Sequence, residues 1–397
     1  MNLEFGLMLV LVFQCLFAGL NLLFFLPLRP KRSPAASTSV SRVSVLVPAR
    51  NEASNLQRLL ASLVLQDDDN FEVIVLDDHS QDATLEVIRG FALDDSRILP
   101  LTGEDLPKGW LGKNFACFQL SRAASGEILI FTDADTVWAS DGVRLIREAF
   151  EHTKAGALSA WPKQVCRDPL SSLIQPLQQW SLLTFLPMWF VPMRAFPLAV
   201  AANGQLLAFR KAAYVQIGGH ASVRRSVIED MSLARLVKRS GGKFVLYNAC
   251  GVVRTHMYQN IQETWAGYAK NAYPAFGANP IALFLVLIFN LGLYVLPWFW
   301  FALHPKPETL LLVIFSLVPR VLADVVAGYD LRLSIFHPVS VLAWTCISLQ
   351  SVLWYVTGKV IWKGRQYDLR KPTKALRSKH PSLLDTAEFK ARQKRQS

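Results

Sequence analysis

The sequence predicts an α/β fold with an open, mostly parallel sheet, held at a membrane by apolar helices near both ends of the chain. Three observations lead to this prediction. Short apolar runs alternate with amphipathic segments between residues 42 and 260, as in sheets whose strands are joined by helices. Long uncharged apolar stretches lie at residues 5–28 and again after residue 280. The 397 residues are 52% hydrophobic and 18% charged, with a mean hydropathy of +0.26, whereas soluble domains carry about 25% charged residues.

The first apolar stretch, residues 5–28, contains no charged residue and is long enough to cross a hydrocarbon core of about 30 Å as a helix. A cleaved signal peptide is the alternative, but it should begin with basic residues, and Glu4 is the only charge before the run. The basic residues Arg29, Lys31 and Arg32 follow the run instead. By the positive-inside rule, the segment is an uncleaved anchor and the residues after it lie in the cytosol.

Strands and helices alternate in the next part of the chain. Apolar, β-branched runs predict strands at Val43–Val47, Phe71–Leu76, Glu127–Thr132 and Lys243–Asn248. Helical spacing of apolar residues predicts helices at Ala53–Leu65, Ala83–Leu93, Asn114–Ala124 and Ser232–Lys238. We therefore divide the chain into an anchor and linker (1–41), an α/β domain (42–260), an interfacial and transmembrane region (261–358) and a basic cytosolic tail (359–397).

Three further membrane segments are expected, at Ile281–Leu303, Thr309–Gly328 and Pro338–Gly358. The middle segment carries Arg320 and Asp324, four residues apart on one helix face. Three crossings after a cytosolic domain place the basic tail outside, against the positive-inside rule. Either the middle segment is re-entrant or interfacial, or the rule does not hold for this chain.

Residues 170–202 are apolar and aromatic but are interrupted by Pro187, Pro192 and Pro197. Prolines at this spacing do not suit a spanning helix, because each removes a backbone donor and clashes with the preceding turn. Helices lying in the membrane interface suit such a Trp-rich sequence. A buried core helix is the alternative, and the sequence leaves both open.

The net charge of +12 is concentrated at the C-terminus. Residues 359–397 contain 12 Lys and Arg against three acidic residues, and so hold nine of the net charges. A basic tail after an apolar segment fits anionic lipid headgroups, and no basic patch interleaved with aromatic residues accompanies it. We expect an anionic bilayer as a partner, and no nucleic acid. The five cysteines are far apart without a CxxC pair, which disfavours a structural zinc site or a disulfide framework.

The strongest local signal for chemistry is Thr132-Asp133-Ala134-Asp135, directly after a predicted strand. Carboxylates two residues apart in an extended turn can hold one hard divalent cation and leave positions open for substrate oxygens. We expect Mg²⁺ or Mn²⁺ there, because the metal would balance phosphate charge that the carboxylates repel. A lone Asp-x-Asp is common, but its position at the carboxyl end of a strand favours a functional one.

Two more polar loops follow the first and second predicted strands, at Pro48–Glu52 and Asp77–Asp82. Both lie at the same edge of a parallel sheet, where such sheets bind ligands. Their side chains can accept hydrogen bonds from a nucleoside base or a ribose. Each loop alone also has a structural explanation, helix capping for Asn51-Glu52 and turn chemistry for Asp78 and Ser80.

The spacing of Val43-Ser-Val-Leu-Val-Pro-Ala-Arg-Asn-Glu52, Val75-Leu-Asp-Asp-His-Ser-Gln-Asp82 and Phe131-Thr-Asp-Ala-Asp135 resembles glycosyltransferase family 2. The resemblance implies the GT-A fold, a Rossmann-like nucleotide-sugar domain. Residues 106–113 and 362–367 resemble a narrower membrane-bound branch, which includes carotenoid glycosyltransferases of the diaponeurosporenoate type and hopanoid-associated relatives. The resemblance covers residues 42 to about 260 well and the membrane part loosely. It implies a multi-pass enzyme of the cell membrane with its catalytic domain in the cytosol.

The resemblance also implies which residues contact the donor. Ala49, Glu52 and Asp78 match positions that hold the nucleoside, with Asp78 at the base, and Pro48 precedes them in the same loop. Lys113 is our own inference, as a cation near the diphosphate, and a surface lysine is the alternative.

Three residues are candidates for the metal site. Asp133 and Asp135 match the motif that holds the metal and the diphosphate. His256 resembles the late histidine that completes this site in many GT-A enzymes. The alternative for His256 is a core or surface histidine.

The resemblance further implies a catalytic base. Glu229-Asp230 matches the acidic pair whose aspartate is the base in inverting members, and Asn203-Gly204 resembles the acceptor loop. We expect Glu229 and Gly204 to contact the nucleotide sugar. Inverting transfer is an in-line displacement, so Asp230 would deprotonate an acceptor hydroxyl opposite the departing diphosphate. The alternative is that Asp230 is only an acid in the first turn of a helix.

One difference from other members of the family narrows the range of possible acceptors. Processive polysaccharide synthases of this family carry the motif Gln-x-x-Arg-Trp. The most similar segment of this chain, Gln259–Trp265, has no Arg-Trp pair. We therefore expect a single transfer to a membrane lipid, with residues 170–202 and 258–276 as an apolar entrance. Together with these residues, the resemblance implies an inverting, metal-dependent transfer from a UDP-linked sugar to a carotenoid- or terpenoid-like lipid. The alternatives are a polyprenyl-phosphate glycosyltransferase and a membrane scaffold that binds a nucleotide sugar without turnover.

Overall fold

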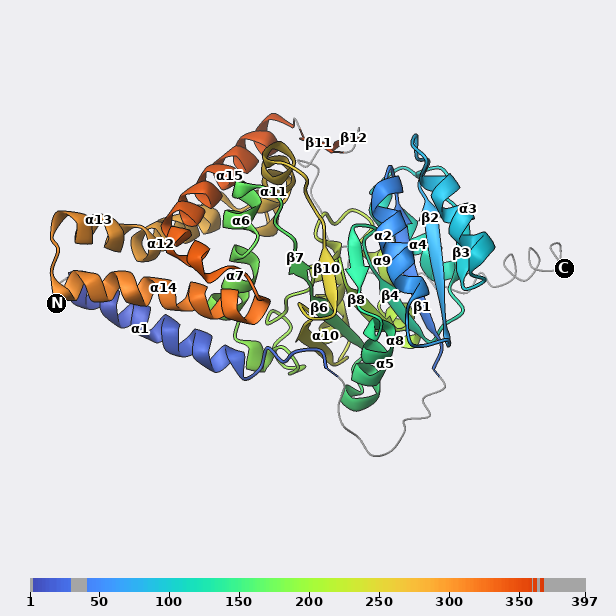
Figure 1. The fold of residues 1–397 in the computed structure, drawn as a ribbon, viewed down its shortest axis with the longest axis horizontal. Helices are drawn as coiled ribbons and strands as arrows, with labels where there is room; N and C mark the ends of the chain where they lie inside the picture. Colours follow the sequence, from blue (N-terminus) through green and yellow to red (C-terminus); the bar gives the residue numbers. More distant parts are fainter. Residues whose placement is uncertain (1–2, 30–40, 359, 363–364, 368–397) are drawn as a thin grey trace.

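The computed structural model describes residues 3–29, 41–358, 360–362 and 365–367 of the 397-residue chain. An α/β half and a helical half lie end to end (Figure 1). The N-terminal helix lies in the helical half, beside helices that come from the far end of the sequence. Most of the predicted linker and of the basic tail lies outside the described residues.

The α/β half is built on a seven-stranded sheet with the order β3-β2-β1-β4-β8-β6-β9. In that order the strands are Ile98–Thr102, Phe71–Asp77, Val43–Ala49, Ile128–Phe131, Leu207–Arg210, Ala157–Trp161 and Phe244–Asn248. Neighbouring strands are parallel, except that β8 runs antiparallel to β4 and β6. The mostly parallel α/β sheet is therefore confirmed, with one reversed strand that the sequence analysis did not predict.

Helices pack on this sheet through apolar faces. They are α2 (Ala53–Val64), α3 (Thr84–Asp94), α4 (Gly112–Ala123), α5 (Gly142–Thr153), α8 (Lys211–Gln216) and α10 (Glu229–Arg239). The short helix α9 (Gly219–Ser222) packs on α4, α8 and α10 instead. In α2 the buried residues Leu56, Leu59, Leu60 and Leu63 recur at the spacing of one helix face. Helices on both faces explain why every residue of β2 is buried.

A smaller sheet joins the two halves. Its strands are β5 (Thr136–Trp138), β10 (Val253–Thr255) and β7 (Lys163–Gln164), with β10 in the middle. β7 and β10 lie between the main sheet and the helical half (Figure 1). This sheet therefore places the residues that follow β4 next to those that follow β10.

Four helical segments of the described chain are long and apolar enough to cross a membrane. They are α1 (Leu3–Leu22), Pro280–Leu303, α14 (Pro307–Ala327) and Leu331–Thr357. The second consists of α12 (Pro280–Tyr294) and α13 (Leu296–Leu303), and the fourth of η2 (Leu331–Phe336) and α15 (His337–Thr357). The four predicted segments are thus found as helices, except that the helix in the first, predicted over residues 5–28, ends at Leu22. After them come two short strands, β11 (Val360–Trp362) and β12 (Arg365–Tyr367), which pair antiparallel.

The proline-interrupted segment forms α6 (Pro169–Ile174), α7 (Leu177–Phe185) and η1 (Met188–Phe190). Helix α7 packs against α1 and α14, and most of its side chains are buried. The Asn21 amide of α1 donates to the carbonyls of Leu183 and Leu186 at 2.8 Å. For α7, the core-helix alternative is therefore the correct one. Met193 and Leu198, beyond η1, are exposed.

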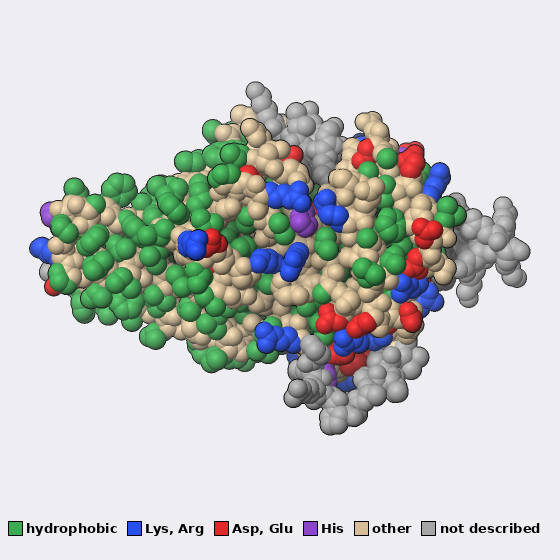
Figure 2. Space-filling view, viewed as in Figure 1, with side chains coloured by type: hydrophobic (Ala, Val, Ile, Leu, Met, Phe, Trp, Pro, Cys, Tyr) green, Lys and Arg blue, Asp and Glu red, His purple; other side chains and the backbone are tan. Residues whose placement is uncertain are grey.

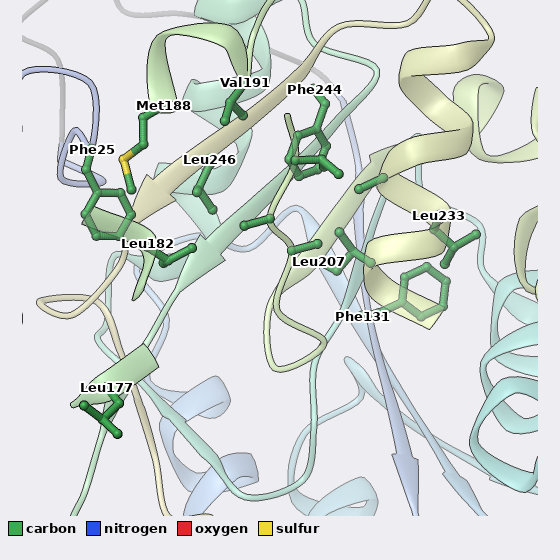
Figure 3. Packing of buried hydrophobic residues seen from close by; sticks show 14 of the residues in the cluster. Phe25, Phe131, Leu177, Leu182, Met188, Val191, Leu207, Leu233, Phe244 and Leu246 are labelled. Atoms are coloured by element: carbon green, nitrogen blue, oxygen red, sulfur yellow. The ribbon is translucent and has the colours of Figure 1, made fainter. Parts of the chain in front are cut away.

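One buried apolar cluster continues from the helical half into the sheet. Figure 3 shows part of it, from Phe25 and Met188 to Phe131 and Leu233. Phe131 ends β4, directly before the turn that carries Asp133, and Leu233 belongs to α10. The packing that joins the halves therefore also fixes the ends of β4 and α10.

Helix α14 contains a buried ion pair. Arg320 Nε donates to Asp324 Oδ2 at 2.7 Å, and both side chains are fully buried. Ser334 Oγ of η2 donates to the same carboxylate oxygen at 2.7 Å. The predicted placement of Arg320 and Asp324 on one helix face is therefore confirmed.

Removing one member of this pair leaves an uncompensated charge in the interior. We expect Arg320→Ala to lower the free energy of unfolding by about 3–5 kcal/mol. Thermal unfolding of the purified protein in detergent measures the change, with the exposed Arg332→Ala as the control. Equal stability of the two variants would contradict the assignment of Arg320 as a structural cation.

Candidate active site

The carboxyl ends of three parallel strands bring the predicted polar loops to one edge of the sheet. Ala49 at the end of β1 is in register with Asp77 at the end of β2, and β4 ends on the other side of β1. The loops after these strands begin at Arg50, Asp78 and Thr132. The shared edge expected from the sequence is therefore present.

A narrow pocket of about 10 Å³ lies beside the end of β4. Its polar lining brings together residues that are far apart in the chain, namely Lys113, Thr132, Asp133, Gly204, His220, Glu229 and Asp230, and Pro48 lines it as well. This volume is close to that of a single water molecule. The pocket is therefore too small to enclose a whole nucleotide sugar.

Lys113 of α4 bridges the two acidic sides of this pocket. Its Nζ lies 2.8 Å from Asp133 Oδ1 and 3.1 Å from Glu229 Oε1, with 41% of the side chain exposed. Desolvation alone would lower the pKa of Lys113, but the charges of Asp133 and Glu229 outweigh it and hold the pKa well above its usual value. The ammonium group thus provides the positive charge between the two carboxylates.

Asp230 lies in the first turn of α10 and faces the same pocket. Its Oδ2 accepts a hydrogen bond from the Gly204 backbone N–H at 3.0 Å, and its Oδ1 accepts one from its neighbour Met231 at 2.7 Å. Burial and the adjacent charge of Glu229 raise the pKa of Asp230 to about 7. A carboxyl group with a pKa near neutrality can take up a proton during a reaction at physiological pH.

The three candidate metal ligands are not gathered at one point. The His256 N–H donates to the Asp135 carbonyl at 2.8 Å, so the backbones are adjacent. The His256 ring, however, lies with Nδ1 3.0 Å from Arg167 Nη2, while Asp133 holds Lys113. Burial and nearby arginines, Arg167 first, lower the pKa of His256. No group of three or more His, Cys, Asp or Glu side chains is placed to hold a metal among the described residues.

The loops after β1 and β2 are tied to each other. Asn51, at φ +53°, donates its N–H to Ser80 Oγ at 3.0 Å and accepts the N–H of Gln81 at 2.8 Å. The Glu52 N–H donates to Thr84 Oγ1 at 2.9 Å. Asp78 donates its N–H to the Ala49 carbonyl at 2.8 Å. The residues predicted to contact the nucleoside therefore lie on two loops that hydrogen bonds hold together, namely Ala49, Glu52 and Asp78. They lie outside the narrow pocket that Pro48 lines.

His220 lines the pocket and was not among the predicted residues. The Tyr214 hydroxyl lies 2.7 Å from its Nδ1, and the ring packs on Phe131 with centroids 4.7 Å apart. Burial and the charge of Lys113 lower the pKa of His220 to about 3, so the ring is neutral at physiological pH. Nothing in its sequence neighbourhood, Gly218-Gly219-His220, distinguishes it from an ordinary core histidine.

Comparison with known proteins identifies the class of protein. Residues 44–231 match the family model described as Glycosyl transferase family 2. The match includes the turn at Asp133 and ends just after Asp230. The chain therefore carries a glycosyltransferase family 2 domain, and the protein is a glycosyltransferase.

Similar curated proteins include two that are named 4,4'-diaponeurosporenoate glycosyltransferase. The one from Staphylococcus haemolyticus is 27% identical over 263 residues, which cover 63% of this chain and 66% of the relative. The one from Staphylococcus aureus is 25% identical over 348 residues, which cover 83% of this chain and 89% of the relative. The similarity to the second relative thus extends beyond the glycosyltransferase domain into the helical half.

Among solved structures, a mannosyltransferase from Pyrobaculum calidifontis, in complex with GDP-Man and Mn²⁺, matches with a TM-score of 0.50 and 18% identity. The match covers 87% of this chain and 95% of the mannosyltransferase. At this identity the likeness shows the fold, which is the GT-A α/β fold.

Proposed function

We propose that this protein is an inverting, metal-dependent glycosyltransferase that moves a sugar from a nucleotide sugar to a lipid in the membrane. The observation that carries the proposal is the shared pocket of Asp133 and Asp230, which come from different elements. Inverting transfer requires one group to hold the departing diphosphate and another to act on the acceptor from the opposite side. Asp133 would supply the first function through the metal ion that it would hold, and Asp230 would supply the second.

Asp230 is proposed as the base. It removes the proton of an acceptor hydroxyl as the oxygen attacks the anomeric carbon and the bond to the diphosphate breaks. Its contact with the Gly204 N–H orients the carboxylate, and its raised pKa matches a group that must hold this proton. Lys113, released from Asp133 and Glu229, would pair with the diphosphate.

A divalent metal ion, Mg²⁺ or Mn²⁺, is part of the proposal. Asp133 already attracts a cation, the Lys113 ammonium, at 2.8 Å, and the carboxylates of Asp133 and Asp135 are the oxygen donors that these ions prefer. When bound, the metal would neutralise charge on the leaving diphosphate. His256 remains a candidate ligand only if its ring leaves Arg167.

The helical half supports a lipid acceptor. Four helical segments long enough to span a membrane belong to the helical half, which adjoins the catalytic half, and the curated relatives are named 4,4'-diaponeurosporenoate glycosyltransferase. We therefore propose a carotenoid- or terpenoid-like lipid as the acceptor, a UDP-linked sugar as the donor, and a cytosolic position for the catalytic half. A polyprenyl phosphate is the second candidate acceptor.

The proposal is tested by incubating the purified protein with a panel of nucleotide sugars and a lipid extract of its host. We expect a lipid product heavier by one sugar residue, together with release of a nucleoside diphosphate. Donor binding without either product would instead identify a scaffold that binds nucleotide sugars.

The pKa of Asp230 gives the reaction a defined pH dependence. Because the base must be unprotonated, we expect kcat/KM to rise with pH, to reach half of its maximum at about pH 7 and to level off at higher pH. Glu229→Gln removes the neighbouring negative charge that raises this pKa, so the midpoint should move to lower pH. A pH–rate profile of each protein measures the two midpoints, and an unchanged midpoint in Glu229→Gln would contradict the assignment.

A further inference from the structure

A second cavity, of about 430 Å³, lies where the small sheet meets the helical half. Residues of β7 and β10 line one side of it, and residues of α6, α14 and η2 line the other. Its charged lining residues are Lys163, Arg254, Arg320 and Asp330. None of these four lines the pocket of Asp133 and Asp230. The cavity is therefore a separate site with three cationic side chains and one acidic one in its lining, and the cation Arg320 is paired with the buried Asp324 behind it.

Arg320 points to an anion as the ligand. Its side chain is fully buried, with Nε on Asp324 and Nη1 3.4 Å from Ser340 Oγ. Its Nη2 has no hydrogen-bond partner. A guanidinium N–H that is buried without an acceptor is costly. Arg320 lines the cavity, and an anionic oxygen that reached Nη2 from it would supply the missing acceptor.

The position of the cavity points to an anion carried by a lipid. Arg320 lies two turns before the end of α14, a candidate membrane helix, so the cavity is at its α/β end. Val165, Pro176 and Leu333 contribute apolar lining, and Leu331 and Ile335 beside it on η2 are about half exposed. Figure 2 shows Lys and Arg side chains gathered where the hydrophobic surface of the helical half meets the mixed surface of the α/β half. Anionic headgroups collect at such a boundary.

We propose that this cavity binds the anionic headgroup, a carboxylate or a phosphate, of a membrane lipid. Arg320 Nη2 supplies the buried donor, and Arg254 and Lys163 supply charge nearer the opening. Lys163 Nζ donates to the Gly328 carbonyl at 2.6 Å and keeps further protons for the ligand. The volume exceeds that of either headgroup alone, so the first part of the lipid chain fits as well.

Binding to the full-length protein in neutral detergent tests this proposal without any donor sugar. The probes are phosphatidylglycerol, oleate, phosphatidylcholine and inorganic phosphate, each followed by native mass spectrometry. We expect phosphatidylglycerol or oleate to bind at least about tenfold more tightly than phosphatidylcholine or inorganic phosphate. The stronger of the two identifies the headgroup as phosphate or carboxylate.

The double variant Lys163→Gln/Arg254→Gln should weaken this binding by about tenfold or more. The control Lys108→Gln/Arg239→Gln removes two exposed cations elsewhere and should leave it unchanged. Arg320 is kept, because its loss is expected to destabilise the fold. Equal binding of phosphatidylcholine or inorganic phosphate, or equal loss in both double variants, would overturn the proposal. Since no turnover is measured, such a failure leaves the proposed glycosyl transfer untouched.

Discussion

Asp230→Asn is expected to lower turnover by about 10²–10⁴-fold, the contribution usual for a positioned general base. The amide keeps the shape of the side chain and its oxygen can still accept the Gly204 N–H, so the pocket should stay intact although the hydrogen bond from the Met231 N–H is lost. It cannot take a proton from an acceptor hydroxyl. The affinity for the nucleotide sugar, measured separately by calorimetry, should be unchanged.

The same variant separates the proposed acceptors. A phosphate or carboxylate acceptor is already ionised and needs less help from a base, so its transfer should lose less than that of a hydroxyl. The exposed Asp94→Asn serves as the control and should retain full turnover. Turnover equal to wild type in Asp230→Asn would exclude Asp230 as a base.

Asp133→Asn is expected to have the second large effect, a loss of about 10²–10³-fold, because it removes the carboxylate proposed to hold the metal that would balance the diphosphate charge. The metal concentration needed for half-maximal activity should rise as well. A titration with Mg²⁺ or Mn²⁺ at saturating donor measures both quantities.

The variant Lys113→Met distinguishes the proposed metal binding by Asp133 from a role in which Asp133 only positions Lys113. It removes the ammonium that lies 2.8 Å from Asp133 but leaves the carboxylate in place. We expect weaker donor binding with an unchanged metal requirement. If Lys113→Met and Asp133→Asn instead raised the metal requirement equally, Asp133 would have no separate part in metal binding.

The sequence was sufficient to predict the edge of the sheet where the site lies. Strand β4 is a short, fully apolar run, so the position of Asp133 directly after it followed from its pattern. The parallel pairing of β1 with β2 then brought the loop of Asp78 to the same edge. The prediction that Asp230 lies at this edge came from the family resemblance, because nothing in the sequence around α10 indicates where that helix packs.

The directions in which side chains point could not be predicted from the sequence. His256 does follow β10 beside Asp135, yet its ring turns to Arg167, which comes from the loop after β7. The reversed strand β8 has only four residues and no alternation that would reveal its direction. Lys113 is a similar case, because its bridge between Asp133 and Glu229 depends on where α4 and α10 meet.

The stereochemistry of the product tests the central claim most directly. If Asp230 acts on the acceptor from the face opposite the diphosphate held at Asp133, a single displacement must invert the anomeric carbon. From an α-linked nucleotide sugar, the lipid product isolated from wild-type protein should carry a β linkage, read from the coupling constant of its anomeric proton. An α-linked product would contradict the account.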